Sequence, residues 1–118
     1  MSPATWMAVG VIGGTASVAR MLGTLWLGRG MPFRGTLIVN LAGTFALGIL
    51  VGAHVTGDAL LLAGAAFLGA FTTFSTWVHE VALLWEAGRR RPACVLLTGA
   101  LAGGLTAAGA GWGLGGLL

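Results

Sequence analysis

Residues 69–80 read GAFTTFSTWVHE and place four side-chain hydroxyls within five positions of an otherwise apolar segment. The segment around them, from about residue 59 to residue 85, is long enough to cross a lipid bilayer, which requires roughly 20 apolar residues. Hydroxyl groups can satisfy backbone groups that a helix break sets free inside a membrane. The stretch therefore predicts a membrane helix that is broken near its middle, at Gly69 and the hydroxyls that follow it.

The composition of the whole chain points to lipid as its solvent. Of its 118 residues, 57% are hydrophobic and only 8% are charged, against roughly 25% charged in an ordinary soluble domain. A soluble domain of this length would need far more polar residues to cover its surface. Composition thus argues against a soluble enzyme and against a disordered segment. The single Cys94 also excludes an internal disulfide and a cysteine-based zinc site.

Four apolar segments are long enough to span a bilayer. They cover about residues 4–27, 35–55, 59–85 and 92–118, and only short linkers separate them. We therefore expect one all-α domain over residues 1–118, which crosses the cell (plasma) membrane four times.

The charged residues are unevenly distributed between the loops. With four spans, the loops after the first and third spans lie on the same side of the membrane. These two loops contain Arg29, Arg34, Arg89, Arg90 and Arg91, whereas the loop between them contains only Asp58. Short arginine-rich loops remain in the cytoplasm, so both termini are predicted to lie outside the cell.

The arginines do not indicate a nucleic-acid-binding protein. Such a protein needs a basic stripe along its surface, whereas the charges of this chain lie at the ends of the apolar segments.

Glycine is unusually abundant, with 22 residues, most of them inside the spans. Four pairs have the small-xxx-small spacing that lets membrane helices approach closely: Gly10 and Gly14, Gly48 and Gly52, Gly99 and Gly103, and Gly109 and Gly113. Together they predict a tightly packed bundle. Four thin helices hardly enclose a pathway by themselves, so we also expect an oligomer.

The polar and aromatic side chains inside the spans each have a structural and a functional interpretation. Asn40 is either an interhelical hydrogen-bonding residue, worth about 0.6 kcal/mol on average, or an amide donor to an anion. Phe74 and Trp77 share a helix face and either pack in the core or turn their positive ring edges toward a small anion. Glu80 is a functional candidate or simply pairs with Arg20 or a hydroxyl. Backbone carbonyls exposed at the break would suit a small cation.

Three segments carry a resemblance to a known family. They are residues 13–20, with Gly13-Gly14 and Ala19-Arg20, residues 35–43, which read GTLIVNLAG, and residues 69–80. Through these segments the chain resembles the Fluc/CrcB fluoride channels, and the resemblance covers nearly the whole chain. It implies a passive, fluoride-selective channel that lowers cytoplasmic fluoride and is no enzyme. It also implies an antiparallel (dual-topology) dimer with two pores and a structural sodium ion at the dimer interface.

The resemblance assigns roles to individual residues. It implies that the backbone carbonyls of Gly69 and Thr72 from both subunits hold the sodium ion. It implies that Asn40 donates to fluoride and that Phe74 is the first of two pore phenylalanines. The residues expected to support the break or line the pathway are Thr73, Ser75 and Thr76, and those expected to assist from nearby are Arg20, Glu80 and Thr98.

Two departures from the family pattern concern the pore. Trp77 stands where the family has its second pore phenylalanine, and the fourth span offers only Cys94, Thr98 and Ala102 in place of a polar track that includes a tyrosine. The strong arginine bias between the loops also predicts one fixed orientation. The dimer is therefore either a homodimer or, by our hypothesis, a heterodimer with a homologous chain of opposite orientation.

Two competing functions remain open. A small proton-coupled multidrug exporter would have a similar length and four spans, but its chemistry requires a carboxylate in the first span, and this chain has none there. A non-conducting assembly subunit of a heterodimeric fluoride channel is the other alternative, and the altered aromatic and polar positions favour it.

Overall fold

The computed structural model describes the backbone of residues 1–118 and every side chain except that of residue 32. The described residues form helices and turns, without strands. The elements are α1 (Pro3–Gly28), α2 (Pro32–Gly52), α3 (Gly57–Ala59), η1 (Leu60–Leu68), α4 (Gly69–Phe71), α5 (Phe74–Glu86) and α6 (Arg90–Gly115).

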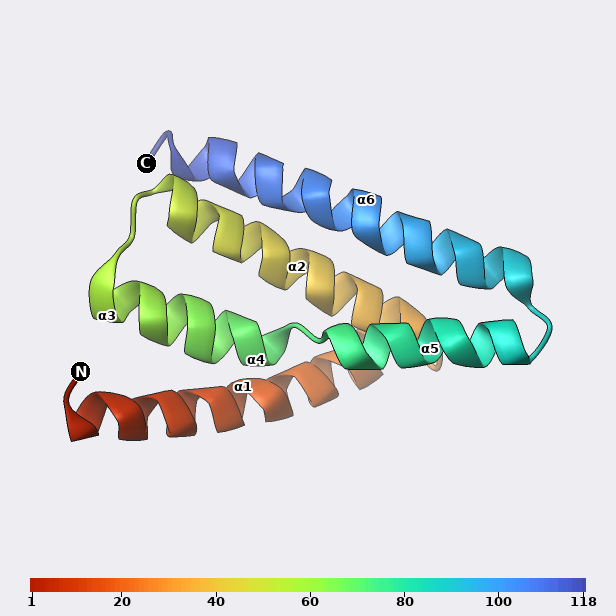
Figure 1. Cartoon of the computed structure of the whole chain (residues 1–118), viewed down its shortest axis with the longest axis horizontal. Helices are drawn as coiled ribbons and strands as arrows, with labels where there is room; N and C mark the ends of the chain where they lie inside the picture. The colour runs from red at the N-terminus through yellow and green to blue at the C-terminus, as the bar shows by residue number, and fades with distance from the viewer.

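The chain runs back and forth along its longest axis (Figure 1). Both termini and the α2–α3 connection lie toward one end, and the α1–α2 and α5–α6 connections lie toward the other. Among the described residues, four helical segments are long and apolar enough to cross a membrane, and they comprise Pro3–Gly28, Phe33–Gly52, Gly57–Glu86 and Arg90–Gly115. The third of these contains four consecutive elements, from α3 to α5.

Local signals explain where the helices begin and end. The Ser2 side chain accepts a hydrogen bond from the amide of Thr5 at the start of α1, and Pro3 occupies the first turn, where its missing N–H is not needed. The helix ends at Arg29, which has a left-handed backbone with φ of 47°. Gly88, with φ of 76°, supplies the same left-handed conformation in the turn between α5 and α6.

Glycines make the close contact between α2 and α6. A Cβ atom on Gly48 or Gly52 would collide with backbone carbonyl oxygens of α6, and one on Gly111 or Gly115 would collide with those of α2. The two helix backbones can therefore approach closely only because these positions lack side chains.

The glycine pair of α1 and the Gly109–Gly113 pair of α6 do not pack helices within this chain, and of the Gly99–Gly103 pair only Gly103 meets another helix, at Leu41. A Cβ on Gly10, Gly14, Gly99, Gly109 or Gly113 would meet no described atom within 4 Å. Of the four pairs predicted from spacing, only Gly48–Gly52 therefore packs with both members inside the protomer. On α6 the contact uses Gly111 and Gly115, because a shift of two residues turns a helix by about 200° and selects the opposite face.

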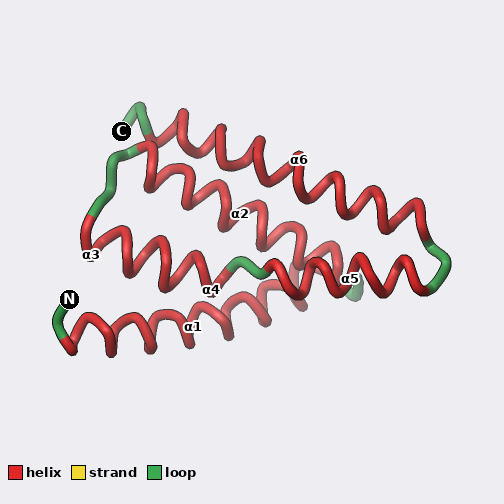
Figure 2. The backbone as a smooth tube through the Cα atoms, in the orientation of Figure 1, coloured by secondary structure: helices red, strands yellow, loops and turns green.

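The third membrane-spanning segment is irregular over most of its length. Leu60–Leu68 forms a π-helix, and the amide of Gly69 donates to the carbonyl of Gly64 five residues earlier. Thr72 and Thr73 then leave helical geometry, with φ and ψ of −84° and 153° and of −144° and 120°. Figure 2 shows these two residues as a short loop between α4 and α5.

The main apolar cluster lies where α5 meets α6 and the start of α2. It consists of the buried residues Trp77, Leu84, Ala93 and Leu96, with Phe33, Val81 and Ala100 packed against it. Other large side chains face outward, as expected for a protein in lipid. The exposed tryptophans Trp6 and Trp112 lie near the start of α1 and the end of α6, and Trp26 and Trp85 lie near the opposite helix ends. This placement matches the aromatic belts of membrane interfaces.

The glycine contact between α2 and α6 can be tested by adding single methyl groups. Gly52→Ala and Gly111→Ala should each lower the free energy of unfolding by about 1–3 kcal/mol, because the new Cβ is forced against a backbone carbonyl. Thermal unfolding in detergent micelles, followed by circular dichroism, measures the loss. Gly113→Ala is the matched control on the open face of α6 and should leave stability unchanged or slightly raised. Equal losses in all three variants would contradict this packing.

Candidate functional site

Asn40 of α2 lies beside the interruption between α4 and α5 and pairs with its backbone. The side-chain amide nitrogen of Asn40 donates to the carbonyl of Thr73 at 2.8 Å, and the backbone amide of Thr73 donates to the side-chain oxygen of Asn40 at 2.7 Å. A backbone group without a partner is costly inside lipid. One side chain thus replaces both hydrogen bonds that Thr73 loses by leaving the helix.

Thr73 also begins the helix that follows. Its hydroxyl accepts from the backbone amide of Thr76 at 3.3 Å, as an N-cap residue does, and lies 3.1 Å from the hydroxyl of Thr76. The backbone amide and the hydroxyl of Thr72 both donate to the carbonyl of Leu68, at 2.9 and 3.0 Å. The two threonines therefore end one helix and start the next within two residues.

The interruption changes what the carbonyl of Gly69 can bind. In a continuous helix this oxygen would accept from the amide of Thr73, but that amide donates to Asn40. The last carbonyls of a helix have no intrahelical donors, so the end of α4 presents oxygen atoms that are free for another partner. Such oxygens are hard ligands that suit a small cation.

Gly43 allows the interruption to sit close to α2. It is buried, and a Cβ at this position would collide with the side-chain methyl of Thr72 and lie 3.4 Å from the ring of Phe71. Any larger residue would push Thr72 away from α2. The hydrogen bonds from Asn40, one turn earlier on α2, would then be stretched.

A pocket of about 210 Å³ opens beside the interruption. Its polar lining comes from Asn40, Thr44, Thr72 and Thr73, and its aromatic lining from Phe74 and Trp77. Leucines of α2 and the α6 residues Ala100, Leu101 and Gly104 complete the wall. Amide, hydroxyl and aromatic groups thus surround one small space within the membrane-spanning region.

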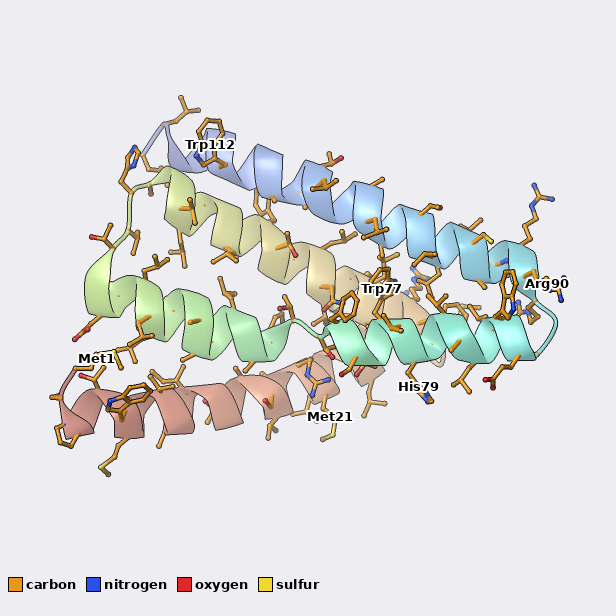
Figure 3. The ribbon with its side chains drawn as sticks, in the orientation of Figure 1. Met1, Met21, Trp77, His79, Arg90 and Trp112 are labelled. Atoms are coloured by element: carbon orange, nitrogen blue, oxygen red, sulfur yellow. The ribbon has the colours of Figure 1, made fainter. Side chains whose placement is uncertain are left out.

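The two aromatic residues of the pocket have different surroundings. Their rings form an edge-to-face pair, with centroids 5.3 Å apart and an interplanar angle of 65°. Trp77 is only 6% exposed and points toward α6 (Figure 3), where its indole N–H donates to the carbonyl of Leu96 at 3.4 Å. Phe74 is 73% exposed. The pocket wall formed by Phe74 therefore faces the outside of the protomer.

Glu80 has a hydroxyl partner, one of the two alternatives raised from the sequence. The hydroxyl of Thr36, a fully buried residue of α2, donates to one carboxylate oxygen of Glu80 at 2.8 Å. The other oxygen is buried without a described partner, and so is the Nε atom of Arg20. The sequence alternative that is confirmed is therefore the pairing of Glu80 with a hydroxyl, that of Thr36.

The remaining candidate residues are distributed around the pocket rather than in it. Arg20 and Thr76 line a separate hollow of about 410 Å³ with Ser17 and Thr24. Ser75 is exposed. The hydroxyl of Thr98 donates to the carbonyl of Cys94 in its own helix, at 2.7 Å. The structure thus brings together Asn40, Thr73, Phe74 and Trp77 around the pocket, whereas Arg20, Ser75 and Thr98 do not line it.

Two polar residues of the site were not identified from the sequence. Thr36 binds Glu80, and Thr44 lines the pocket and donates to the backbone carbonyl of Asn40 at 2.7 Å. Both could have been found from their spacing, because positions 36, 40 and 44 repeat every four residues and so share one face of a helix. α2 therefore presents a polar stripe to the third membrane-spanning segment.

Comparison with known proteins gives a consistent family match. The family model described as CrcB-like protein, Camphor Resistance (CrcB), matches residues 7–112. The fluoride-specific ion channel FluC 2 of Mycolicibacterium paratuberculosis is 46% identical over 93 residues, which are 76% of each chain. FluC 2 of Moorella thermoacetica is 38% identical over 113 residues, which cover 91% of this chain and 93% of the relative. FluC 1 of Symbiobacterium thermophilum is 39% identical over 121 residues, covering 94% and 97%.

Replacement of Asn40 tests its role at the interruption. Asn40→Leu should lower the free energy of unfolding by about 1–3 kcal/mol, because it leaves the amide and carbonyl of Thr73 unpaired in an apolar region. Thermal unfolding in micelles measures the change. Thr98→Val is the control. It removes one hydrogen bond from a side chain to the backbone, but every backbone hydrogen bond of α6 remains. A loss for Asn40→Leu no larger than that for Thr98→Val would contradict the assignment.

Proposed function

The chain belongs to the CrcB-like family, as a multi-pass membrane protein rather than an enzyme, and from this premise we propose that it is a passive, fluoride-selective ion channel. The relatives described above carry the name of fluoride-specific ion channels. The single observation that best supports the proposal is the pocket that joins the Asn40 amide, threonine hydroxyls and two aromatic rings within the membrane-spanning region.

The chemical task of such a channel is to replace the water around a small, strongly hydrated anion. The side-chain nitrogen of Asn40 carries two hydrogens, and only one is needed for the carbonyl of Thr73. The second can donate to fluoride. The hydroxyls of the pocket add further donors, and the positive ring edge of Phe74 adds attraction without a full charge that would trap the ion. Several weak sites of this kind let an ion enter and leave.

Trp77 contributes its ring to this pathway rather than its N–H group. The indole N–H donates to Leu96, and the ring meets Phe74 edge to face. The residue can therefore line the pathway as an aromatic wall, in the manner expected of a phenylalanine. A larger ring in that position leaves less room, so we expect it to affect conduction through the pore that contains it.

The direction of flow follows from the membrane potential. An interior that is negative by 100 mV favours the exit of one negative charge by about 2.3 kcal/mol. Fluoride enters cells as the neutral acid and ionises inside, so a passive path lowers its cytoplasmic concentration without coupling to another ion.

The outward-facing side of Phe74 supports an assembly of two chains. The pocket wall at this residue is open to the outside of the protomer, so one chain does not surround an anion. We propose that a second chain, inserted in the opposite orientation, completes the enclosure. The arginine-rich loops of this chain fix a single orientation, which favours a homologous partner of opposite charge bias over a second copy. In that arrangement the partner supplies the second pore phenylalanine and the tyrosine of the fourth span, which this chain lacks.

The carbonyls of Gly69 and Thr72 fit the proposed structural sodium ion. They lie at the interruption, and the carbonyl of Gly69 has lost its helical donor to Asn40. Two chains meeting at this point would bring together four hard oxygen atoms, which a sodium ion would hold in place by charge. The ion would supply structural order at the dimer interface.

Fluoride release from liposomes tests the channel. Vesicles containing this chain and a homologous partner of opposite charge bias should release fluoride when a potassium ionophore balances the charge, as followed with a fluoride electrode. Phe74→Ile should slow release by about threefold to tenfold, because it removes the aromatic edge. Phe67→Ile is the control, since Phe67 stacks on Phe71 outside the pocket.

The outcomes separate the competing functions. Full release by this chain alone would contradict the heterodimer but support the channel. No release in either arrangement, together with proton-coupled uptake of a lipophilic cation, would indicate the exporter. Release that persists unchanged when Phe74 is replaced in this chain would indicate a non-conducting assembly subunit.

Removal of sodium tests the proposed ion. Thermal unfolding of the assembled channel should occur at a lower temperature in N-methylglucamine or potassium salts than in sodium salts of equal ionic strength. A sodium concentration 100 times the dissociation constant corresponds to about 2.7 kcal/mol of stabilisation, which is several degrees for a protein of this size. Identical unfolding temperatures in the three salts would exclude a structural sodium ion.

A further inference from the structure

A groove distinct from the pocket and the hollow described above lies between the starts of α2 and α6 and the last turns of α5. Its volume is about 400 Å³. The apolar lining includes Leu37 of α2, Leu84 of α5, and Val95 and Leu96 of α6. The function proposed above does not use this groove, since the pocket beside Asn40 shares only Leu37 with it.

The mouth of the groove is positively charged. Arg34 and Arg89 both line it, both are exposed, and the lining includes no acidic residue. They lie at the first turn of α2 and directly before α6, so the positive ends of two long helices face the same place. Arg90 is next to them and stacks on Trp85, with its guanidinium carbon 5.0 Å from the ring centroid. Figure 3 shows Arg90 at this end of the molecule.

The groove continues from the charged mouth into the apolar region. It follows α6 from Arg89 to Gly99, a distance of about 15 Å at 1.5 Å per residue. A Cβ on Gly99 would meet no described atom within 4 Å, so the far part of the groove is open. A charged mouth and an apolar channel of this length match the two parts of a phospholipid.

We propose that this groove binds one anionic phospholipid from the arginine-rich side of the membrane, with its phosphate at Arg34 and Arg89 and an acyl chain along Leu37, Leu96 and Gly99. Two arginines without an acidic neighbour in the lining favour a headgroup that keeps a net negative charge over a zwitterionic one. The apolar length favours a lipid over free phosphate. Basic pockets between membrane helices recognise anionic headgroups by the same chemistry.

A lipid in this position would contact the residues that support the pocket beside Asn40. Leu37 lines both spaces, and the carbonyl of Leu96 accepts the hydrogen bond from the indole of Trp77. The bound lipid would therefore stabilise the packing of α5 against α6 behind Trp77.

Lipid binding can be measured without fluoride, which makes the result independent of the proposed channel function. The full-length protein, with its partner chain if assembly requires one, is delipidated in detergent and titrated with phosphatidylglycerol or phosphatidylcholine. Native mass spectrometry counts the lipids that remain bound. We expect one tightly bound phosphatidylglycerol per chain and no retained phosphatidylcholine, and no competition from inorganic phosphate at constant ionic strength.

A charge-matched pair of variants locates the site. The double variant R34Q/R89Q should bind phosphatidylglycerol about 30-fold more weakly. The double variant R29Q/R91Q removes the same charge from the same end of the protein, but neither residue lines the groove, so binding should change by less than about threefold. If both double variants lost the same affinity for phosphatidylglycerol, the binding would depend on general surface charge rather than on this groove, and the proposal would be overturned.

Gly99→Leu provides a test that keeps every arginine. The added side chain fills open space in the groove and favours the helix, so the protein should fold and yet lose the retained phosphatidylglycerol. Circular dichroism verifies folding of each variant. Undiminished lipid binding in folded Gly99→Leu, or equal retention of phosphatidylcholine by the unmodified protein, would overturn the proposed site.

Discussion

The need to pair every backbone polar group inside lipid is the constraint on which this structure depends. An interruption at Thr72 and Thr73 sets free groups that no solvent in the membrane could satisfy. The side chain of Asn40 satisfies two of them through paired hydrogen bonds of 2.8 and 2.7 Å. The interruption and Asn40 are therefore coupled through the two hydrogen bonds.

The second helix acts as a scaffold with two different faces. Its glycines Gly48 and Gly52 fit against the backbone of α6, whereas its polar stripe, at positions 36, 40 and 44, faces the third membrane-spanning segment. Close packing on the glycine side fixes the position of α2. The polar side of α2 can then place Asn40 within hydrogen-bonding distance of Thr73, and Thr36 within hydrogen-bonding distance of Glu80. Helix packing and site geometry thus share one cause, which is the side-chain pattern of a single helix.

The sequence predicts those features that depend on one segment at a time. Hydropathy predicts an all-α chain with four apolar segments, and the hydroxyl-rich run lies where Thr72 and Thr73 are extended. Features that depend on the register between helices were not predicted. The glycines at 111 and 115 make the contact rather than those at 109 and 113, and Thr36 is the partner of Glu80. The π-helix at Leu60–Leu68 gives no local signal, because its side chains are those of an ordinary apolar helix.

The difference between Phe74 and Trp77 connects the single chain to the proposed assembly. The two rings touch edge to face, yet Trp77 is 6% exposed and hydrogen-bonded to α6, whereas Phe74 is 73% exposed. Burial fixes the tryptophan within its own protomer, so it can act only on the pocket of this chain. The phenylalanine is held on one side by Trp77 and is free to meet another surface on the other. An anion that passes along the exposed side of Phe74 would therefore contact the chain that positions the aromatic pair and, in the proposed assembly, the second chain as well.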